Sequence, residues 1–568
     1  MDAKKHDGKL KLWRLSNWRR LTQIASLLLF MYFLYEIRFP WEVGYKPTQY
    51  LRFDLLVNIF GLIIGIGLIT GFVFVIILVL SLIINRTLCG WVCPLGALLD
   101  MFRKLFVKPI NGGKVPLRKR AYGWKFIILN SFAVLAIFGI PLLWLWEPMS
   151  LLPRSITTIF FPPFNAGIDV TSNYLRESEM LPGVARYLNN NMLDPWPPYY
   201  LHAFLMLIIF AIPFALEFRH SRGFCRLLCP LGGLMAYLSP FAWAKRNVSD
   251  NCTECLTCHK DCRMGAIYNS GRDYNPTECI LCGDCIDVCP TRAVSFNFKP
   301  GIDGKLHQAI TESNVEPGWE GGRYSLSRMA FVASLGVGLI TVPLIKHADA
   351  SAIRPADHLR PPGSVPEDEF MKRCLKCGAC IKVCPTHGLQ PSLLETGLAG
   401  LFTPHLVPVL GECEYACNSC GLVCPSGAIE PLVIDGNINE KDYALMGIAY
   451  FKRDLCIPTA IGEPCQVCEE HCPTSPKSII MRDEVVLNGD MEEVTVPVPY
   501  IVEETCIGCG ICERVCPVEE ERAVKCIYRG ERRGKKAVEE YKEFRKEWDA
   551  NRKDLENIAG ESGWISPY

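Results

Sequence analysis

Four long, mostly apolar stretches dominate the first 245 residues of this chain. They cover residues 21–37, 55–84, 126–146 and 199–218. A helix needs about 20 mostly apolar residues to cross the roughly 30 Å of hydrocarbon in a bilayer, and these stretches have about that length. A helix of a soluble protein is rarely apolar on every side over such a distance. The pattern therefore predicts a four-helix transmembrane domain over residues 1–245, which we call the helical domain.

The distribution of Lys and Arg predicts which way this domain faces. Residues 1–20 carry seven of them and residues 85–125 carry nine, whereas residues 38–54 and 147–200 carry three each. Because Lys and Arg concentrate in cytoplasmic loops, the N-terminus, the 85–125 loop and the segment after Phe218 are expected in the cytoplasm of a bacterial inner-membrane protein. The 147–200 loop then faces outward, and its aromatic residues, such as Phe160, Phe164 and Trp196, indicate an interfacial cap.

A fifth apolar stretch follows a polar linker in the region 301–350. Residues 329–345 are mostly apolar, lie behind Arg323 and Arg328, and are interrupted by Pro343. Seventeen residues are the lower limit for a span, and the basic start also resembles an export signal. We expect an uncleaved fifth transmembrane helix that places residues 351–568 on the periplasmic side. A cytoplasmic packing helix is the alternative.

Cysteine spacing carries the chemistry of the remaining chain. Twenty-eight of the 29 cysteines fall into eight short groups, and six of these groups are runs of four. Four runs have C-x2-C-x2-C-x3-C spacing: Cys252, Cys255, Cys258, Cys262; Cys279, Cys282, Cys285, Cys289; Cys374, Cys377, Cys380, Cys384; and Cys506, Cys509, Cys512, Cys516. Two runs have a longer first gap: Cys413, Cys417, Cys420, Cys424; and Cys456, Cys465, Cys468, Cys472. This spacing is that of [4Fe–4S] ligands, in which the fourth Cys serves the other cluster of a pair, so about six clusters are expected.

Other roles for these cysteines fit less well. Disulfide frameworks belong to small secreted domains, whereas this chain has 568 residues, 49% of them hydrophobic. Structural zinc uses separated C-x2-C pairs, not three cysteines and a fourth before proline, as at Pro290, Pro385 and Pro517. The first run departs from this pattern because Arg263 takes the place of proline. Cys526 belongs to no run and is interpreted as a buried structural thiol.

An internal repeat lies in the helical domain. Residues 86–98 and 222–234 share the pattern Arg-x2-Cys-x3-Cys-Pro-Leu-Gly, and each copy follows the second helix of a predicted hairpin. Cysteines four apart share one face of a helix, so the two copies would bring together four thiols at the cytoplasmic border. These are Cys89, Cys93, Cys225 and Cys229. The four-thiol site is predicted to hold a further metal or small iron–sulfur centre, and four reduced cysteines that merely pack are the alternative.

The runs divide the rest of the chain into domains. Residues 246–300 predict a two-cluster α+β ferredoxin-like domain (the two-run domain), with Cys262 completing the Cys279 run and Cys289 completing the Cys252 run. Residues 351–530 hold four runs (the four-run domain), and residues 531–568 form a charged helical tail. By analogy with other sixteen-cysteine electron-transfer subunits, the outermost runs should pair with each other and the inner two likewise. Pairing of neighbouring runs is the alternative. The fold class is thus multidomain, an α-helical transmembrane bundle with α+β iron–sulfur domains.

With these motifs, the chain resembles a fusion of two families. Residues 1–300 resemble the NapH-type membrane ferredoxins, with four transmembrane helices, two C-x3-C-P motifs and a two-cluster domain. Residues 320–530, with Arg360-Pro361-Pro362-Gly363 before the first run, resemble the exported NapG/MauM-type ferredoxins, although the paired arginines of their export signal are absent. The resemblance implies electron transfer from membrane quinol to a periplasmic reductase or cytochrome c partner.

The quinol site is expected among ionisable residues near helix ends. Glu36, Glu147 and His202 lie near outer ends, and Glu217 and His220 near inner ends; His202 and Glu217 come first among them. An accessory factor that supplies electrons or metal to a partner metalloenzyme is the alternative function. An ion-coupled redox subunit would need more intramembrane acids. The net charge of +1 gives no reason to expect nucleic acid.

Overall fold

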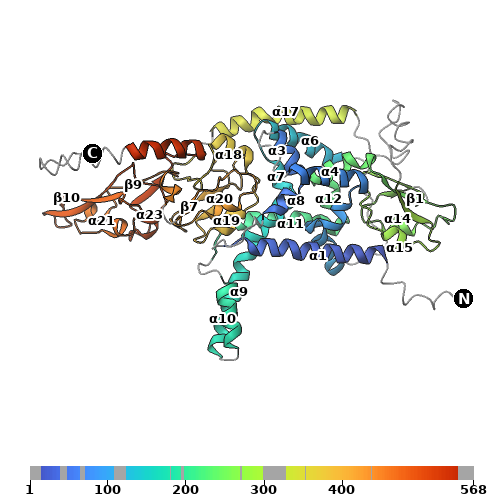
Figure 1. The fold of residues 1–568 in the computed structure, drawn as a ribbon, viewed down its shortest axis with the longest axis horizontal. Coiled ribbons are helices and arrows are strands. Elements are labelled where there is room, and N and C mark those ends of the chain that lie inside the picture. Colours follow the sequence, from blue (N-terminus) through green and yellow to red (C-terminus); the bar gives the residue numbers. More distant parts are fainter. Residues whose placement is uncertain are drawn as a thin grey trace.

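The computed structural model describes most of the chain. Its described residues are 14–38, 48–63, 71–107, 123–178, 181–193, 198–268, 271–298, 328–351, 354–435 and 438–547. Residues 301–327 of the expected linker, residues 108–122 of the 85–125 loop, Trp196 and the end of the charged tail lie outside these residues. Figure 1 shows an elongated molecule with the helical domain in the middle, the two-run domain at one end and the four-run domain at the other.

The helical domain is built from long and short helices around several apolar cores. Its helices are α1 (Leu15–Glu36), α2 (Gln49–Arg52), α3 (Leu55–Ile63), α4 (Gly71–Ile84), α5 (Pro94–Phe106), α6 (Trp124–Ile137), α7 (Leu143–Trp146), α8 (Pro148–Ser155), α11 (Ala203–Arg219), α12 (Gly223–Leu227) and α13 (Pro230–Leu238). Leu56, Trp144 and Leu99 are buried, whereas Leu28 and Phe204 on the outer surface are 64% and 74% exposed. The domain therefore presents apolar side chains outward as well as inward.

The apolar stretches do not all form single helices. The third predicted span is divided, because α6 ends at Ile137, Gly139 turns the chain at a φ of 86°, and α7 begins at Leu143. Within the described residues one helix segment, Met329–Asp349, is long and apolar enough to cross a membrane. Val75–Ile84 and Trp124–Ile137 are apolar but shorter.

Two helices leave the bundle. Helices α9 (Phe161–Glu177) and α10 (Pro182–Asn191) form a hairpin that projects sideways from the body, close to the four-run domain (Figure 1). Helix α17 (Arg328–Ser351) runs along the bundle in the same general direction as α1 and packs on α6 (Figure 1). Asn130 Nδ2 donates to Ser334 Oγ at 3.0 Å within this contact.

The two-run domain is a small α+β unit. Its elements are β1 (Ala244–Val248), α14 (Thr257–Asp261), β2 (Ile267–Tyr268), β3 (Asp273–Tyr274), α15 (Asp284–Asp287) and β4 (Val294–Phe298). β1 pairs antiparallel with β4, with Ala244 opposite Phe298, and β2 pairs with β3. The two short helices pack against each other, so that the cysteine runs lie between them and the strands.

The four-run domain repeats this plan with more hairpins. Its helices are α18 (Glu367–Arg373), α19 (Ala379–Val383), α20 (Ser419–Val423), α21 (Ile457–Ala460), α22 (Val467–Glu470) and α23 (Ile511–Val515). Its strands pair antiparallel as β5 (Leu389–Pro391) with β6 (Pro404–Leu406), β7 (Ile434–Asp435) with β8 (Ile438–Asn439), β9 (Ile448–Phe451) with β12 (Val524–Ile527), and β10 (Ile479–Leu487) with β11 (Glu493–Ile501). A helix over 534–547 follows, and Tyr541 is buried beneath Arg532.

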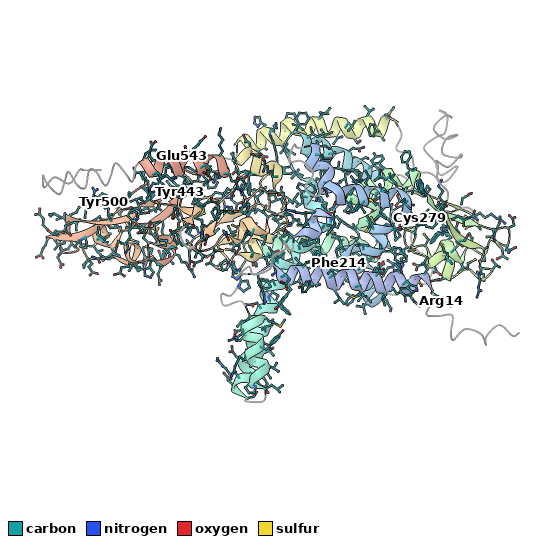
Figure 2. All side chains as sticks on the ribbon, viewed as in Figure 1. Arg14, Phe214, Cys279, Tyr443, Tyr500 and Glu543 are labelled. Carbon is teal, nitrogen blue, oxygen red and sulfur yellow. The ribbon has the colours of Figure 1, made fainter. Side chains whose placement is uncertain are left out.

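Ionic contacts join the helical domain to the two-run domain. Arg86 and Lys125 both reach Glu278, and all three side chains are at most 1% exposed. Arg263 Nη1 lies 3.1 Å from Asp100 Oδ1 on α5. In Figure 2, Cys279 marks this end of the molecule, and Phe214 lies within the bundle.

Different contacts join the helical domain to the four-run domain at the opposite end. Lys382 Nζ donates to the carbonyl oxygen of Ile37, just beyond α1, at 2.6 Å. Arg154 Nη1 donates to the carbonyl oxygen of Lys376 at 3.0 Å. Helix α1 therefore begins beside one cysteine-rich domain and ends beside the other, a rise of about 33 Å for its 22 residues.

Candidate metal centres

The two-run domain brings its cysteines together in the crossed arrangement expected from the sequence. One cavity is lined by Cys262, Cys279, Cys282 and Cys285, which are the fourth cysteine of the first run and three cysteines of the second. In the other set, Cys258 is close enough to Cys252 and Cys255 for their charges to interact. Cys289 packs in the same small core as Cys258.

In the four-run domain the neighbouring runs pair. Helices α19 and α20 pack together, and a cavity beside them is lined by Cys374, Cys377, Cys380 and Cys424. The reciprocal set follows from electrostatic contacts, in which Cys384 interacts with Cys417, and Cys420 with Cys413. The pairing of outermost runs that analogy suggested is therefore wrong for this structure, and the alternative, pairing of neighbours, describes it.

The last two runs pair in the same way. Helix α22 packs on α23, and a cavity is lined by Cys472 together with Cys506, Cys509 and Cys512. Cys456 interacts electrostatically with Cys465 and Cys516, and Cys468 with Cys456 and Cys465. Each of the six runs thus supplies three neighbouring thiols to one group and its fourth thiol to the partner group.

The loops that carry the first three cysteines of a run depend on glycine. Gly283, Gly378 and Gly510 have φ values of 81°, 76° and 79°, and each immediately precedes a short helix that carries the third cysteine. A side chain is strained at such a φ, whereas glycine adopts it freely. The tight turn lets the loop wrap around the space that its cysteines face.

The sulfur atoms have electrostatic support from the protein. The backbone N–H of Ala449 donates to Cys506 Sγ at 3.4 Å, and Lys441 Nζ lies 3.2 Å from Cys413 Sγ. Burial raises the pKa of Cys377 and of Cys506 to about 12. Such thiols keep their protons at neutral pH, and metal binding must release them.

These groups suit a cofactor that fills a volume. Within the described residues, no set of three or more His, Cys, Asp or Glu side chains is arranged to hold a single metal ion. Three of the cysteine groups line cavities instead, each with at least four cysteines and with apolar residues such as Ile280, Phe402 or Ile507. The donor set is that of a [4Fe–4S] cluster.

The repeat in the helical domain also brings its cysteines together. Cys93 and Cys229 both interact electrostatically with Cys89 and Cys225. Cys93 and Cys229 each precede a proline at the first position of a helix, α5 and α13 respectively, because proline lacks the N–H that a helix start cannot use. The four-thiol site therefore lies where the two repeats meet.

Two buried arginines cross between the repeats. Arg222 of the second repeat donates from Nη1 to the carbonyl oxygen of Cys89 at 2.8 Å. A Cβ built on Gly96 would lie 3.4 Å from Arg222 Nη1, and one built on Gly232 would lie 3.2 Å from Arg86 Nη2. Arg86 Nη2 is buried without a hydrogen-bond partner in the described structure, and its guanidinium interacts with Cys89, Cys225 and Cys229. Two buried guanidinium groups thus lie beside the four thiols.

The four-thiol site adjoins the two-run domain. A Cβ built on Gly90 would lie 2.9 Å from the carbonyl oxygen of Ile280, in the loop of the Cys279 run. Cys89 packs in the same small core as Cys262, Cys279 and Cys282. The four-thiol site and the Cys279 run are therefore in contact through the backbone at Gly90 and Ile280.

The two residues placed first for a quinol site lie at opposite ends of α11. His202 precedes the helix and pairs with Glu395, 3.6 Å away, with both side chains partly exposed. Glu217 is buried near its other end, where Oε2 accepts the backbone N–H of Arg222 at 2.7 Å. The structure does not bring these two residues together.

The structure gives the neighbours of two features that the sequence analysis treated only singly. Cys526, interpreted there as a buried structural thiol, is buried on β12 and lines the cavity of the Cys506 run. Asp54 and Glu147 form a buried carboxyl pair beside the Cys374 run. Neither feature has a spacing signal, because its members come from elements far apart in the chain.

Comparison with known proteins agrees with this chemistry. One family of 4Fe-4S binding domains matches residues 66–112 and, a second time, residues 203–249. Another family of 4Fe-4S binding domains matches residues 273–295 and 499–519. The first family thus covers both copies of the internal repeat, and the second covers one run in each cysteine-rich domain.

Several curated proteins are similar to part of the chain. The ferredoxin-type protein NapG of Escherichia coli is 35% identical over 183 residues, which are 32% of this chain and 73% of that relative. The methylamine utilization ferredoxin-type protein MauM of Methylorubrum extorquens is 30% identical over 181 residues, 31% of this chain and 76% of that relative. MauM of Paracoccus denitrificans is 33% identical over 196 residues, 34% of this chain and 79% of that relative. No solved structure matches.

Proposed function

Since this chain belongs to the family of NapG- and MauM-type ferredoxins, we propose that it is a membrane-bound carrier of electrons between quinol and a periplasmic redox partner. About six [4Fe–4S] clusters, held by the six crossed cysteine groups, would each accept and donate one electron at a time. A NapH-type helical domain joined to a NapG/MauM-type domain in one chain would make both parts of such a system permanent neighbours.

The arrangement of the domains supports a position across the membrane. The outer surfaces of the helical domain and of α17 are apolar, with Leu21 and Ile24 on α1 and Ile340 on α17 each at least 60% exposed, and such surfaces mark contact with lipid or protein. The 24 residues of α17 rise about 36 Å, enough for the hydrocarbon layer. The two-run domain would then face the cytoplasm, with the N-terminus, and the four-run domain the periplasm.

The cations around the sulfur ligands affect the direction in which electrons would flow, because they change the cluster potentials. Ferredoxin clusters with potentials near −400 mV would make quinol oxidation unfavourable, but hydrogen bonds, charge and burial move cluster potentials over a wide range. Lys441 lies 3.2 Å from Cys413 Sγ, and Arg246 Nη2 lies 3.6 Å from Cys258 Sγ. Both cations favour the reduced, more negative state of the cluster that the sulfur would hold, and so raise its potential.

The crossed grouping of all six runs is the observation that carries this proposal. The test is anaerobic purification of the full chain in detergent or lipid nanodiscs, with iron and sulfide analysis, followed by addition of a water-soluble quinol under electron paramagnetic resonance. We expect iron and sulfide for about six cubane clusters and reduction of part of them by quinol. A preparation that contains the clusters but never exchanges electrons with quinol would favour the accessory role, which predicts loss of metal from a partner enzyme when the gene is deleted.

A further inference from the structure

A buried carboxyl pair lies where the helical domain meets the four-run domain. Asp54 immediately precedes α3, Glu147 lies between α7 and α8, and their side chains are 4% and 0% exposed. The two carboxyl groups lie within hydrogen-bonding reach of each other. Burial raises the pKa of both carboxyl groups, and the charge of Asp54 raises the pKa of Glu147 further.

Several buried polar atoms on the same elements lack partners. Asp54 Oδ1 accepts the backbone N–H of Leu56, and Glu147 Oε2 accepts that of Ser150, each at 2.6 Å. The other carboxyl oxygens, Asp54 Oδ2 and Glu147 Oε1, have no partner in the described structure apart from each other, and Tyr50 Oη, Trp144 Nε1 and Ser150 Oγ have none there. More than nine in ten buried polar groups in proteins are hydrogen-bonded. These donors and acceptors are therefore open to the polar groups of a ligand.

The same residues touch the loop of the Cys374 run. Leu375 packs in one core with Leu56 and Trp144. Tyr50 and Arg154 both interact electrostatically with Cys377 and with Glu147. Tyr50 and Arg154 thus lie near both the carboxyl pair and Cys377, a predicted cluster ligand.

From this juxtaposition we propose that Asp54 and Glu147 form the proton-accepting part of a quinol-headgroup site that faces the Cys374 run. This inference rests on the proposed function and locates its substrate. Oxidation of one quinol breaks two O–H bonds and releases two protons and two electrons. The electrons would leave singly to the iron–sulfur cluster that Cys374, Cys377, Cys380 and Cys424 would hold. The protons leave singly to the carboxyl pair, which returns the first to solvent before it takes the second.

The two residues favoured from the sequence suit this role less well. Glu217 Oε2 already accepts the N–H of Arg222, and Oε1 faces Arg103 at 3.5 Å. His202 is paired with Glu395 and is partly exposed. Glu217 and His202 therefore each have a charged partner, whereas Asp54 Oδ2 and Glu147 Oε1 have polar contact only with each other among the described residues.

The test combines photolabelling with cluster reduction in the full chain. A photoreactive short-chain naphthoquinone should label peptides that contain residues 48–63 or 143–157. Asp54→Asn and Glu147→Gln should reduce this labelling and slow reduction of the clusters by a soluble quinol about 100-fold, the usual contribution of a positioned base. Reduction by dithionite should be unchanged, which shows that the clusters are intact. Asp169→Asn, on the exposed hairpin helix α9, is the matched control and should behave like the wild type.

The outcomes separate this inference from the proposed function. If dithionite but not quinol reduces the wild-type clusters, the proposed function fails, and this site with it. If quinol reduces the wild type and both variants at equal rates, or if the label maps to other peptides, only the assignment of this site is wrong. Should both carboxyl variants fail to fold, Tyr50→Phe, which removes one unpartnered hydroxyl group, must still lower labelling for the inference to stand.

Discussion

Replacement of Glu278 by glutamine tests how the two-run domain is held against the helical domain. Glu278 pairs with Arg86 and with Lys125, and all three side chains are at most 1% exposed. Glutamine keeps the shape of the side chain but removes its charge, which leaves two buried cations side by side. Loss of one member of a buried ion pair costs about 3–5 kcal/mol. At 1.4 kcal/mol per factor of ten, the undocked state should become about 100 to several thousand times more populated.

Hydrogen exchange of the anaerobically purified full chain measures this population. The amide of Cys279 donates to the carbonyl oxygen of Asn275, so peptides across residues 275–287 report on the docked loop. We expect faster exchange there in Glu278→Gln and unchanged exchange in the four-run domain. Glu254→Gln is the matched control, because its pair with Arg272 is 49% and 42% exposed and is worth at most about 1 kcal/mol. Equal exchange in the Glu278 variant and this control would refute the argument that the buried charges hold the interface.

Three further outcomes follow from the structure. Cys225→Ser should remove metal from the four-thiol site and leave the iron of the six runs, as measured by metal and sulfide analysis. Unchanged metal content and spectra would contradict the prediction that the four thiols hold a metal centre. Burial, with the charge of Arg360, lowers the pKa of His405 to about 3 and also lowers that of His358, so the folded chain resists protonation of both. Stability should be complete above about pH 6.5, the ordinary histidine value, and fall as the pH drops below it, by up to about 1.4 kcal/mol per pH unit for each histidine. Denaturant unfolding at pH 7 and 5.5 measures this slope, and a His405→Gln variant with the wild-type slope would exclude His405 as a cause. Although burial opposes it, the Arg360 guanidinium lowers the pKa of Glu367 to about 2. This carboxylate should stabilise the fold above about pH 4.5, and the effect should be lost as the pH falls toward 2. After allowance for the partial exposure of Glu367, the Glu367→Gln variant should lose about 2 kcal/mol of unfolding free energy at pH 7. An unchanged urea midpoint would show that the pair with Arg360 contributes nothing to stability.

The spacing of the cysteines predicted the local structure of the runs because three ligands on one loop are a local property. Gly378 and Gly510 provide the left-handed turns that such loops need. The internal repeat was equally visible, and one family of 4Fe-4S binding domains matches both of its copies.

The group that each fourth cysteine joins is not set by local spacing. For the four-run domain, the analogy with other sixteen-cysteine subunits therefore predicted the wrong pairs of runs. Cys384 and Cys424 find their groups because α19 packs on α20, a contact that depends on the whole domain and not on spacing. The sequence predicted Cys526 to be a buried thiol but not its place beside the Cys506 run, because the pairing of β12 with β9 brings it there.

The departure of the first run from its pattern has a structural explanation. Arg263, which stands where the other runs have proline, pairs with Asp284 of its own domain and with Asp100 on α5. The residue that weakened the motif is therefore one that fixes the two-run domain to the bundle. The cysteine spacing could not show this role, because Arg263 is not a predicted cluster ligand and its ion-pair partner Asp100 lies in another domain.

The crossed arginines imply how such a domain could have arisen. Arg222 supports the turn of the first repeat, and Arg86 lies against Gly232 in the second, so neither half is complete without its counterpart. A protein with a single copy of the repeat would have one guanidinium group without its turn and one turn without its guanidinium group. In a dimer with a two-fold axis, each molecule could supply the guanidinium group that the turn of the other lacks. The smallest working ancestor of this domain is then a symmetric homodimer, later joined into one polypeptide by gene duplication.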